Sequence, residues 1–279
     1  VPVLAVFDDH KQEVDVLENG ASGWVALARS PFYVEAGGQV SDHGSLTLPA
    51  GDALVGGVAR LGPGLPRVHR VQAAAAIRPR DLVTAAVDVA ARNATRRNHT
   101  GTHLLHAALR QVLGPHVKQA GSLVAPDRLR FDFVHFAPLT ADELARVEHI
   151  VNEAILADDP VNTAVRDTQE AIAAGAMALF GEKYGDKVRV VTIGDGRFST
   201  ELCGGTHVAA TGQIGAFLVT EESGVAAGVR RIEALTGLGA LAYARPRLTE
   251  FERVRGYLNA SAEGVRARLE ARVQSLEKA

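Results

Sequence analysis

The hydrophobic pattern of this chain changes its period at about Val89, and this change constrains the fold more than any other feature of the sequence. Before it, short β-rich runs such as GWVALARSPFYVEAGG alternate with dense Gly, Pro and Asp punctuation such as LPAGD and GPGLP. Short strands with turn signals at close spacing are typical of a small barrel, whose last strand we expect at 81–89. We therefore predict a β-barrel domain over residues 1–90.

After Val89 the pattern is helical through RNHTGTHLLHAALRQVL and stops at Gly114–Pro115, which is a common way for a helix to end. A second helix is expected at 140–158, where Thr140 and Glu143 have the spacing of a capping box. A third is expected at 169–180, and strands are expected at 129–136, 161–168, 188–194, 214–223 and 230–237. This mixture predicts an α+β core over residues 91–240, with an antiparallel sheet and segregated helices.

Residues 241–279 are polar and helical in pattern. Their apolar positions fall at spacings of three and four, which puts them in one stripe along a helix. The stripe consists of Phe251, Val254, Leu258, Ala262, Val265, Leu269, Val273 and Leu276. We predict one long helix that starts a coiled-coil or helical arm, with dimerisation as one use of the stripe.

Bulk composition excludes several classes of protein. With 279 residues, 47% of them hydrophobic, and a formal net charge of -2, the chain can build real cores and is not globally basic. No apolar run approaches the ~18–20 residues that span a bilayer, and no signal peptide is evident. The single cysteine, Cys203, excludes an internal disulfide and suits a cytoplasmic location. Because the chain begins at Val1 and its only Met is Met177, we expect a fragment of a longer protein.

The segment RNHTGTHLLH, residues 97–106, holds three of the chain's 10 histidines. His99 and His103 stand four residues apart, so a helix places both imidazoles on one face, one turn apart. His106 lies near that face too, although we interpret it as a neighbour of the pair. This spacing alone is more often ordinary helix surface than a metal site.

A second segment changes that balance. In CGGTH, residues 203–207, Gly204 and Gly205 permit a tight turn that brings Cys203 and His207 toward one point. With His99 and His103 this gives a His3Cys set, which favours Zn²⁺. Four protein ligands are typical of a closed structural site, whereas a catalytic zinc keeps an open position. The chain has no HExxH motif, so it does not read as a zinc protease.

These motifs resemble a known family. HTGTHLLH and CGGTH, together with FYVEAGGQVSDHG (32–44), KQAGSLV (118–124) and LRFDF (129–133), are similar to the editing region of alanyl-tRNA synthetases and to the free-standing AlaX editing proteins. The similarity covers roughly residues 1–240, and the tail resembles the start of the synthetase's C-terminal arm. The aminoacylation domain and its ATP-binding motifs are absent, which fits a fragment.

The resemblance implies an enzyme that hydrolyses the ester of mischarged Ser-tRNA(Ala) and Gly-tRNA(Ala) and spares Ala-tRNA(Ala). Such a second site is needed because a pocket sized for alanine rejects glycine and serine poorly. The implied partners are tRNA(Ala) and the rest of a synthetase chain. His99, His103, Cys203 and His207 match the family's zinc motif. Gln119 and Thr102 match positions linked to editing and to the serine hydroxyl, with Cys203 also expected to act in catalysis.

The role of the zinc stays open at this point. It could lower the pKa of a bound water that attacks the ester, or it could hold the substrate, for instance by its α-amino group, while another water attacks. No Asp or Glu adjacent to HxxxH serves as an obvious general base.

Candidate tRNA contacts are the GGQ segment Gly37–Gly38–Gln39 and the basic pairs Arg96–Arg97 and Arg230–Arg231. Glycines allow close approach of backbone to the acceptor end, and Arg suits phosphate contacts. An ordinary β-turn and a solvated surface are the competing interpretations. The arm at 241–279 could also reach toward tRNA.

Two other functions compete with editing within a synthetase. One is a free-standing trans-editing deacylase of the AlaX kind. The other is a non-catalytic, zinc-stabilised tRNA-binding module. Deacylation of mischarged tRNA separates the enzymes from the module.

Overall fold

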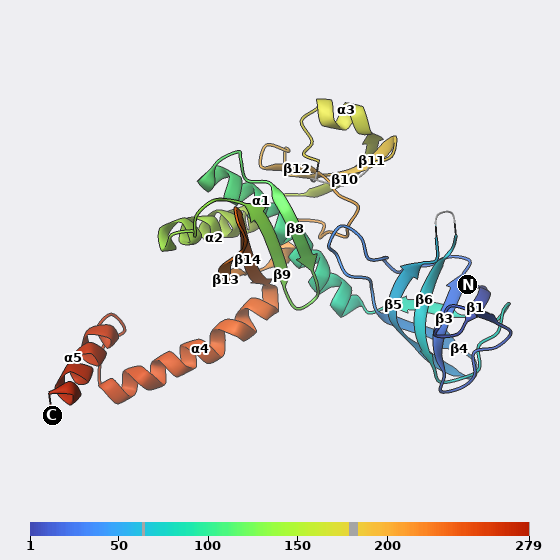
Figure 1. Cartoon of the computed structure of the whole chain (residues 1–279), viewed down its shortest axis with the longest axis horizontal. Helices are drawn as coiled ribbons and strands as arrows, with labels where there is room; N and C mark the ends of the chain where they lie inside the picture. Colours follow the sequence, from blue (N-terminus) through green and yellow to red (C-terminus); the bar gives the residue numbers. More distant parts are fainter. Residues whose placement is uncertain (63–64, 179–183, 279) are drawn as a thin grey trace. The chain divides into compact units, whose positions relative to one another are not determined.

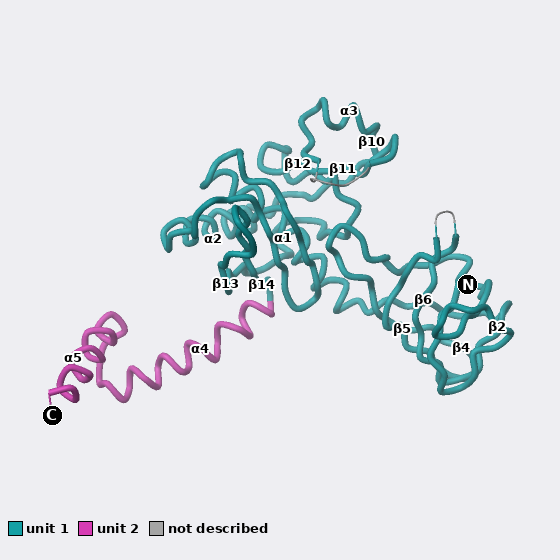
Figure 2. The backbone as a smooth tube through the Cα atoms, in the orientation of Figure 1, with its two compact units in different colours: residues 1–237 teal, residues 238–279 magenta. Residues whose placement is uncertain are grey.

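The chain has an α+β fold in the computed structural model, which describes residues 1–62, 65–178 and 184–278 (Figure 1). The described strands form three sheets, and every strand ladder in them is antiparallel. Figure 2 divides the chain into two compact units, Val1–Gly237 and Leu238–Ala279. The α+β prediction is confirmed.

The first sheet has seven strands in the order β2-β1-β3-β6-β5-β4-β7. The strands are β1 (Val3–Phe7), β2 (Glu13–Val14), β3 (Ser22–Leu27), β4 (Gly44–Leu48), β5 (Gly51–Arg60), β6 (Arg67–Ala73) and β7 (Thr84–Val87). Buried side chains such as Val25, Leu46 and Ile77 form a core within this sheet. In the described part of the chain no strand ladder joins the edges β2 and β7, so barrel closure stays a prediction.

Helix α1 (Val89–Leu113) follows this sheet directly and agrees with the sequence prediction. The side chain of Asp88 caps its N-terminus by accepting a hydrogen bond from the Ala91 amide. Its C-terminus is followed by Gly114, whose φ of 117° suits a glycine. The helix is buried over most of Asn98–Leu109, which includes the histidine segment.

The second sheet has the order β13-β14-β9-β8 and carries the largest core. Its strands are β8 (Gln119–Val124), β9 (Leu129–Val134), β13 (Phe217–Ala226) and β14 (Val229–Thr236). Helices α1 and α2 (Ala141–Leu156) lie side by side and pack into the same core with Phe131 and Phe133 (Figure 1). The capping box of Thr140 and Glu143 is present as predicted, whereas β8 is a strand that the sequence did not reveal.

The third sheet has the order β10-β11-β12, formed by β10 (Val161–Asp167), β11 (Lys187–Ile193) and β12 (Ser199–Leu202). Helix α3 (Thr168–Ala173) contacts this sheet, whereas the short 3-10 helix η1 (Thr211–Ile214) contacts α1 and α2. The helix predicted for 169–180 is too long: α3 ends at Ala173 because Gly175 adopts a φ of 91°, and 179–180 lie outside the described residues. Strand β12 leads directly into CGGTH.

The second unit corrects the prediction of one long C-terminal helix. The segment forms α4 (Gly237–Leu258) and α5 (Val265–Glu277), separated at Asn259, whose φ of 46° is left-handed and ends the helix. Apolar spacing continues across the break, which is why the pattern suggested one helix. In the residues that the structure describes, no helix is long and apolar enough to cross a membrane.

Two separate cores support the proposed division of the first unit at about residue 90. One core lies within the seven-stranded sheet, and the other joins α1 and α2 to the four-stranded sheet. We keep 1–90, 91–240 and 241–279 as proposed domains.

Candidate metal site

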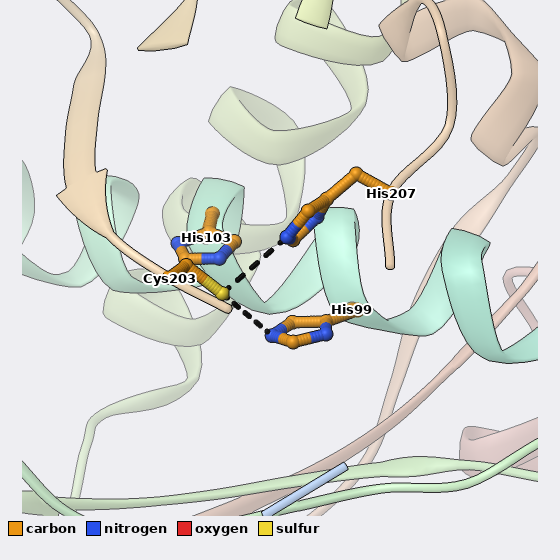
Figure 3. A group of neighbouring side chains, drawn as sticks. All are labelled: His99, His103, Cys203 and His207. Atoms are coloured by element: carbon orange, nitrogen blue, oxygen red, sulfur yellow. Dashed lines mark hydrogen bonds between the residues drawn. The ribbon is translucent and has the colours of Figure 1, made fainter. Parts of the chain in front are cut away.

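Four side chains with metal-ligand chemistry meet between α1 and the turn after β12. One ligand atom from each of His99, His103, Cys203 and His207 can be chosen so that all lie within 4.8 Å of one another. The Cys203 Sγ lies 3.4 Å from the Nε2 atoms of both His99 and His207. Figure 3 shows the histidines of α1 facing Cys203 and His207 across a small space.

Local sequence explains this convergence. His99 and His103 occupy successive turns of α1, and their rings are nearly parallel with centroids 5.3 Å apart. Gly205 lets the CGGTH backbone come up against His99, because a Cβ at this position would stand 2.0 Å from His99 Cε1. The amide of Gly205 also donates to Cys203 Sγ at 3.4 Å.

Each histidine of the cluster has a hydrogen-bond partner on its Nδ1 atom. Gln39 Oε1 lies 2.7 Å from His99 Nδ1, Glu201 Oε2 lies 3.1 Å from His103 Nδ1, and Thr100 Oγ1 lies 3.2 Å from His207 Nδ1. Partners of this kind fix the ring orientation and leave Nε2 for a metal ion. His103 Nε2 is buried and has no hydrogen-bond partner in the described part of the chain, so this atom is a candidate metal ligand.

The electrostatics of the cluster suit a cation. Burial raises the pKa of the Cys203 thiol, but His99 and His103 outweigh burial and hold that pKa well below its ordinary value. Burial and the charge of His99 lower the pKa of His207 to about 3. Burial opposes a charged His103, yet Glu201 and Cys203 raise the pKa of His103 well above its usual value. Before a metal ion binds, the cluster therefore holds a proton on His103, where the negative charges of Glu201 and Cys203 favour a cation.

A pocket of about 120 Å³ opens onto the cluster. Its lining includes both α1 histidines of the pair, Cys203, and the two residues expected from the family, Thr102 and Gln119. Thr102 Oγ1 donates its hydrogen to Asn98 O at 2.8 Å, so it faces the pocket as an acceptor. His106, which the sequence suggested was only a neighbour, lines the pocket as well.

The segment around GGQ forms another wall. Tyr33, Ala36 and Gly37 line the pocket, and Arg92 of α1 pairs with Asp42 to hold this segment against the helix. Gly38 packs against β8, where a Cβ would stand 2.5 Å from the Ser122 carbonyl oxygen.

Sequence reasoning gave Gln39 a different role and did not single out Glu201, although both are buried in the site. Gln39, expected at a tRNA-facing surface, is fully buried; its Oε1 accepts from Thr206 N, and its Nε2 donates to Thr206 Oγ1. Glu201 supplies the carboxylate that appeared to be lacking. Its signal was the strand period of two, which puts Glu201 and Cys203 on the same side of an extended segment.

The arginines that we predicted as tRNA contacts do not belong to the cluster of candidate metal ligands. Arg231 makes a bidentate pair with Asp132 at 2.7 and 2.9 Å, and Arg230 donates to Glu222 at 2.6 Å. Arg96 and Arg97 are half-buried on α1. The pairing of Arg230 and Arg231 with carboxylates makes them weaker candidates for phosphate contacts than Arg96 and Arg97.

Comparison with known proteins now defines the class that the chain resembles. Residues 188–233, which contain the CGGTH segment, match the family described as "Threonyl and Alanyl tRNA synthetase second additional domain". This part of the chain is therefore similar to an accessory domain of threonyl- and alanyl-tRNA synthetases.

Within that class, the whole chain is similar to alanine–tRNA ligases. It is 50% identical over 99% of its length to the enzyme of Nitratidesulfovibrio vulgaris, 49% over 96% to that of Solibacter usitatus, and 48% over 100% to that of Bordetella pertussis. The resemblance to the editing region of alanyl-tRNA synthetases is confirmed. The chain spans 30–31% of the length of these relatives.

Proposed function

We propose that the chain is the editing part of an alanyl-tRNA synthetase, which uses Zn²⁺ to hydrolyse the ester of mischarged Ser-tRNA(Ala) and Gly-tRNA(Ala) and spares Ala-tRNA(Ala). The observation that carries this proposal is the buried three-histidine, one-cysteine cluster beside a small pocket. Its partners are tRNA(Ala) and the remainder of the synthetase.

The size of the pocket supports an aminoacyl substrate. At about 120 Å³ it is well below the ~300–1,000 Å³ of pockets that enclose drug-sized ligands. It has room for a small aminoacyl group, and the terminal nucleotide of the tRNA must then lie outside it. Thr102 Oγ1, whose hydrogen is already donated to Asn98 O, can accept a hydrogen bond from a seryl hydroxyl.

The donor set fits zinc. Imidazole and thiolate are the ligands that zinc prefers, and they must be deprotonated to bind it. The low pKa of Cys203 and of His207 meets this requirement, whereas His103, whose pKa is raised, must give up the proton on Nε2 to bind the ion. When bound, Zn²⁺ supplies Lewis-acid polarisation of a carbonyl or activation of a water.

The other residues of the pocket bind and orient. Gln119, the first residue of β8, presents an amide to the pocket and can hold the aminoacyl ester or a water. Arg96, Arg97 and Gly37 are the proposed tRNA contacts that keep access to phosphate or ribose, while Gly38 packs against β8.

Deacylation tests this function. The zinc-loaded chain is incubated separately with Ser-tRNA(Ala), Gly-tRNA(Ala) and Ala-tRNA(Ala), and release of the amino acid is measured. We expect release of serine and glycine and little release of alanine. Binding without release would instead identify a non-catalytic tRNA-binding module.

Cys203→Ala tests the cluster itself. We expect loss of deacylation together with loss of zinc, because the thiolate is the only anionic member of the four-ligand set. Circular dichroism should show that the fold survives. Wild-type rates in this variant would remove Cys203 from the mechanism.

A further inference from the structure

His106 and Glu201 are buried beside the metal cluster but do not belong to it. They are 2% and 3% exposed, and both line the pocket. His106 lies one helical turn beyond His103 on α1, and Glu201 lies on β12.

Hydrogen bonds fix the state of these side chains. Glu201 Oε2 accepts from His103 Nδ1 at 3.1 Å and from His106 Nδ1 at 3.4 Å, and its Oε1 accepts from Ser199 Oγ at 3.1 Å. A carboxylate only accepts, so both imidazoles carry their hydrogen on Nδ1. The Nε2 atom of a neutral His106 is therefore an acceptor.

Among the residues that the structure describes, His106 Nε2 has no hydrogen-bond partner. Two histidine nitrogens of the pocket lining are buried and unpaired in the described structure, His103 Nε2 and His106 Nε2. The first belongs to the four-ligand cluster, but the second does not. A buried acceptor that is left unpaired is unfavourable, so we expect a hydrogen-bond donor there when the pocket is filled.

We propose that His106, oriented by Glu201, is the general base of the deacylation, an inference that rests on the proposed function. His106 Nε2 takes a proton from a water, and the water oxygen bonds to the ester carbonyl carbon. The bond from that carbon to the ribose oxygen then breaks, and His106 returns the proton to the ribose oxygen. The products are the free amino acid and the tRNA hydroxyl, so atoms and charge balance.

Removal and replacement of the imidazole test this role. In the zinc-loaded His106→Ala variant we expect kcat on Ser-tRNA(Ala) to fall by ~10²–10⁴-fold, with KM and zinc content near wild type. Added imidazole should restore kcat in proportion to its concentration, because it can occupy the vacated space. His149→Ala, which removes an exposed histidine of α2, is the matched control. Its kcat should equal that of the wild type and should not rise when imidazole is added.

Substitution of Glu201 tests the orienting role. Glutamine could still accept from both histidines through its one carbonyl oxygen, so Glu201→Leu, which has no acceptor atom, is the decisive variant: its kcat should fall as well, but imidazole should not restore it because the His106 ring is still in place. A kcat within threefold of wild type in this variant contradicts the orienting role.

The outcomes separate the two proposals. A wild-type chain that releases no amino acid refutes the proposed function and this inference with it. An active wild type accompanied by His106→Ala with unchanged kcat, or with a loss that imidazole does not restore, refutes the inference alone.

Discussion

At the scale of single residues, two adjacent glycines of CGGTH have different tasks. A Cβ on Gly205 would stand 2.3 Å from His99 Nδ1 and 2.8 Å from Gln39 Oε1. These two atoms form the hydrogen bond that orients His99. A Cβ on Gly204 would meet open space, because no described residue apart from its two chain neighbours comes within 4 Å of it. The requirement for glycine at position 205 is thus spatial, and it comes from the metal cluster.

This difference predicts that only one of two alanine substitutions weakens zinc binding. Gly205→Ala should displace His99 and weaken zinc binding by ~10–100-fold, the usual effect of disturbing a partner of a ligand. Gly204→Ala should bind zinc as the wild type does. Competition with a chromophoric chelator measures both affinities, and equal affinities in the two variants would contradict the spatial argument.

Because of His69, we expect the stability of the seven-stranded sheet to depend on pH. It is fully buried, with Nδ1–H donating to Val25 O at 2.9 Å and Nε2 accepting from Ser30 Oγ at 2.7 Å. Burial lowers its pKa below the ordinary value of 6.5 for a histidine. As the pH falls from 6.5 toward the lowered pKa of the folded state, the unfolded chain binds more protons at His69 than the folded chain does, so acid favours unfolding.

We expect His69→Gln to reduce this acid sensitivity. The loss of unfolding free energy between pH 7.5 and 5.5 should be smaller than in the wild type, by at most about 1.4 kcal/mol per pH unit below 6.5. Urea unfolding in excess chelator measures it without interference from the metal. His149→Gln is the exposed control, and an identical loss in all three proteins would exclude His69 as the source.

At the scale of elements, the capping box fixes where α2 begins. Thr140 Oγ1 accepts from the Glu143 amide at 3.2 Å, and Glu143 Oε2 accepts from the Thr140 amide at 2.8 Å. The helix then buries Val147, Val151 and Ile155 in the core that it shares with α1.

Thr140→Ala should destabilise the chain by about 1 kcal/mol, the usual effect of losing such a cap. Thr140→Ser keeps the hydroxyl and should lose much less. Denaturant unfolding at neutral pH measures both variants. Equal stability of the two would show that the cap contributes little to α2.

The elements that could be predicted are those with local signals. Helices α1 and α2 have strong periodicity and marked ends, and their bounds agree with the sequence. Strands β8 and β12 escaped because each is short and its burial depends on partners far along the chain. The break at Asn259 escaped because apolar spacing continues through it.

The site divides in the same way. His99, His103, Cys203 and His207 were predicted as a group from residue type and spacing, and the structure brings them together. Gln39 and Glu201 meet their histidines across 60 and 98 residues of chain, and no local pattern encodes such a contact. Residue chemistry therefore indicated the ligands, whereas only the fold revealed what orients them.

At the scale of the whole molecule, every residue of the candidate site lies in the unit Val1–Gly237. The second unit, Leu238–Ala279, carries exposed apolar side chains such as Phe251, Leu269 and Val273. Dimerisation through this arm stays a prediction.

A chain that ends at Ala240 should therefore bind one zinc ion with the affinity of the full chain. Calorimetric titration of the two proteins measures this, and their circular dichroism spectra verify the fold. A tenfold weaker site in the shorter chain would show that the arm contributes to the metal centre.

The hydrogen bonds of Gln39 to His99 and Thr206 have a consequence for thermal stability. Gln39 comes from the segment that contributes no ligand, yet its amide is bonded to both halves of the cluster. A ligand that binds only the folded state stabilises it by an amount that grows with the logarithm of its free concentration. When Zn²⁺ binds as we propose, the melting temperature of the segment that carries Gln39 should therefore rise with the free zinc concentration, although this segment supplies no ligand.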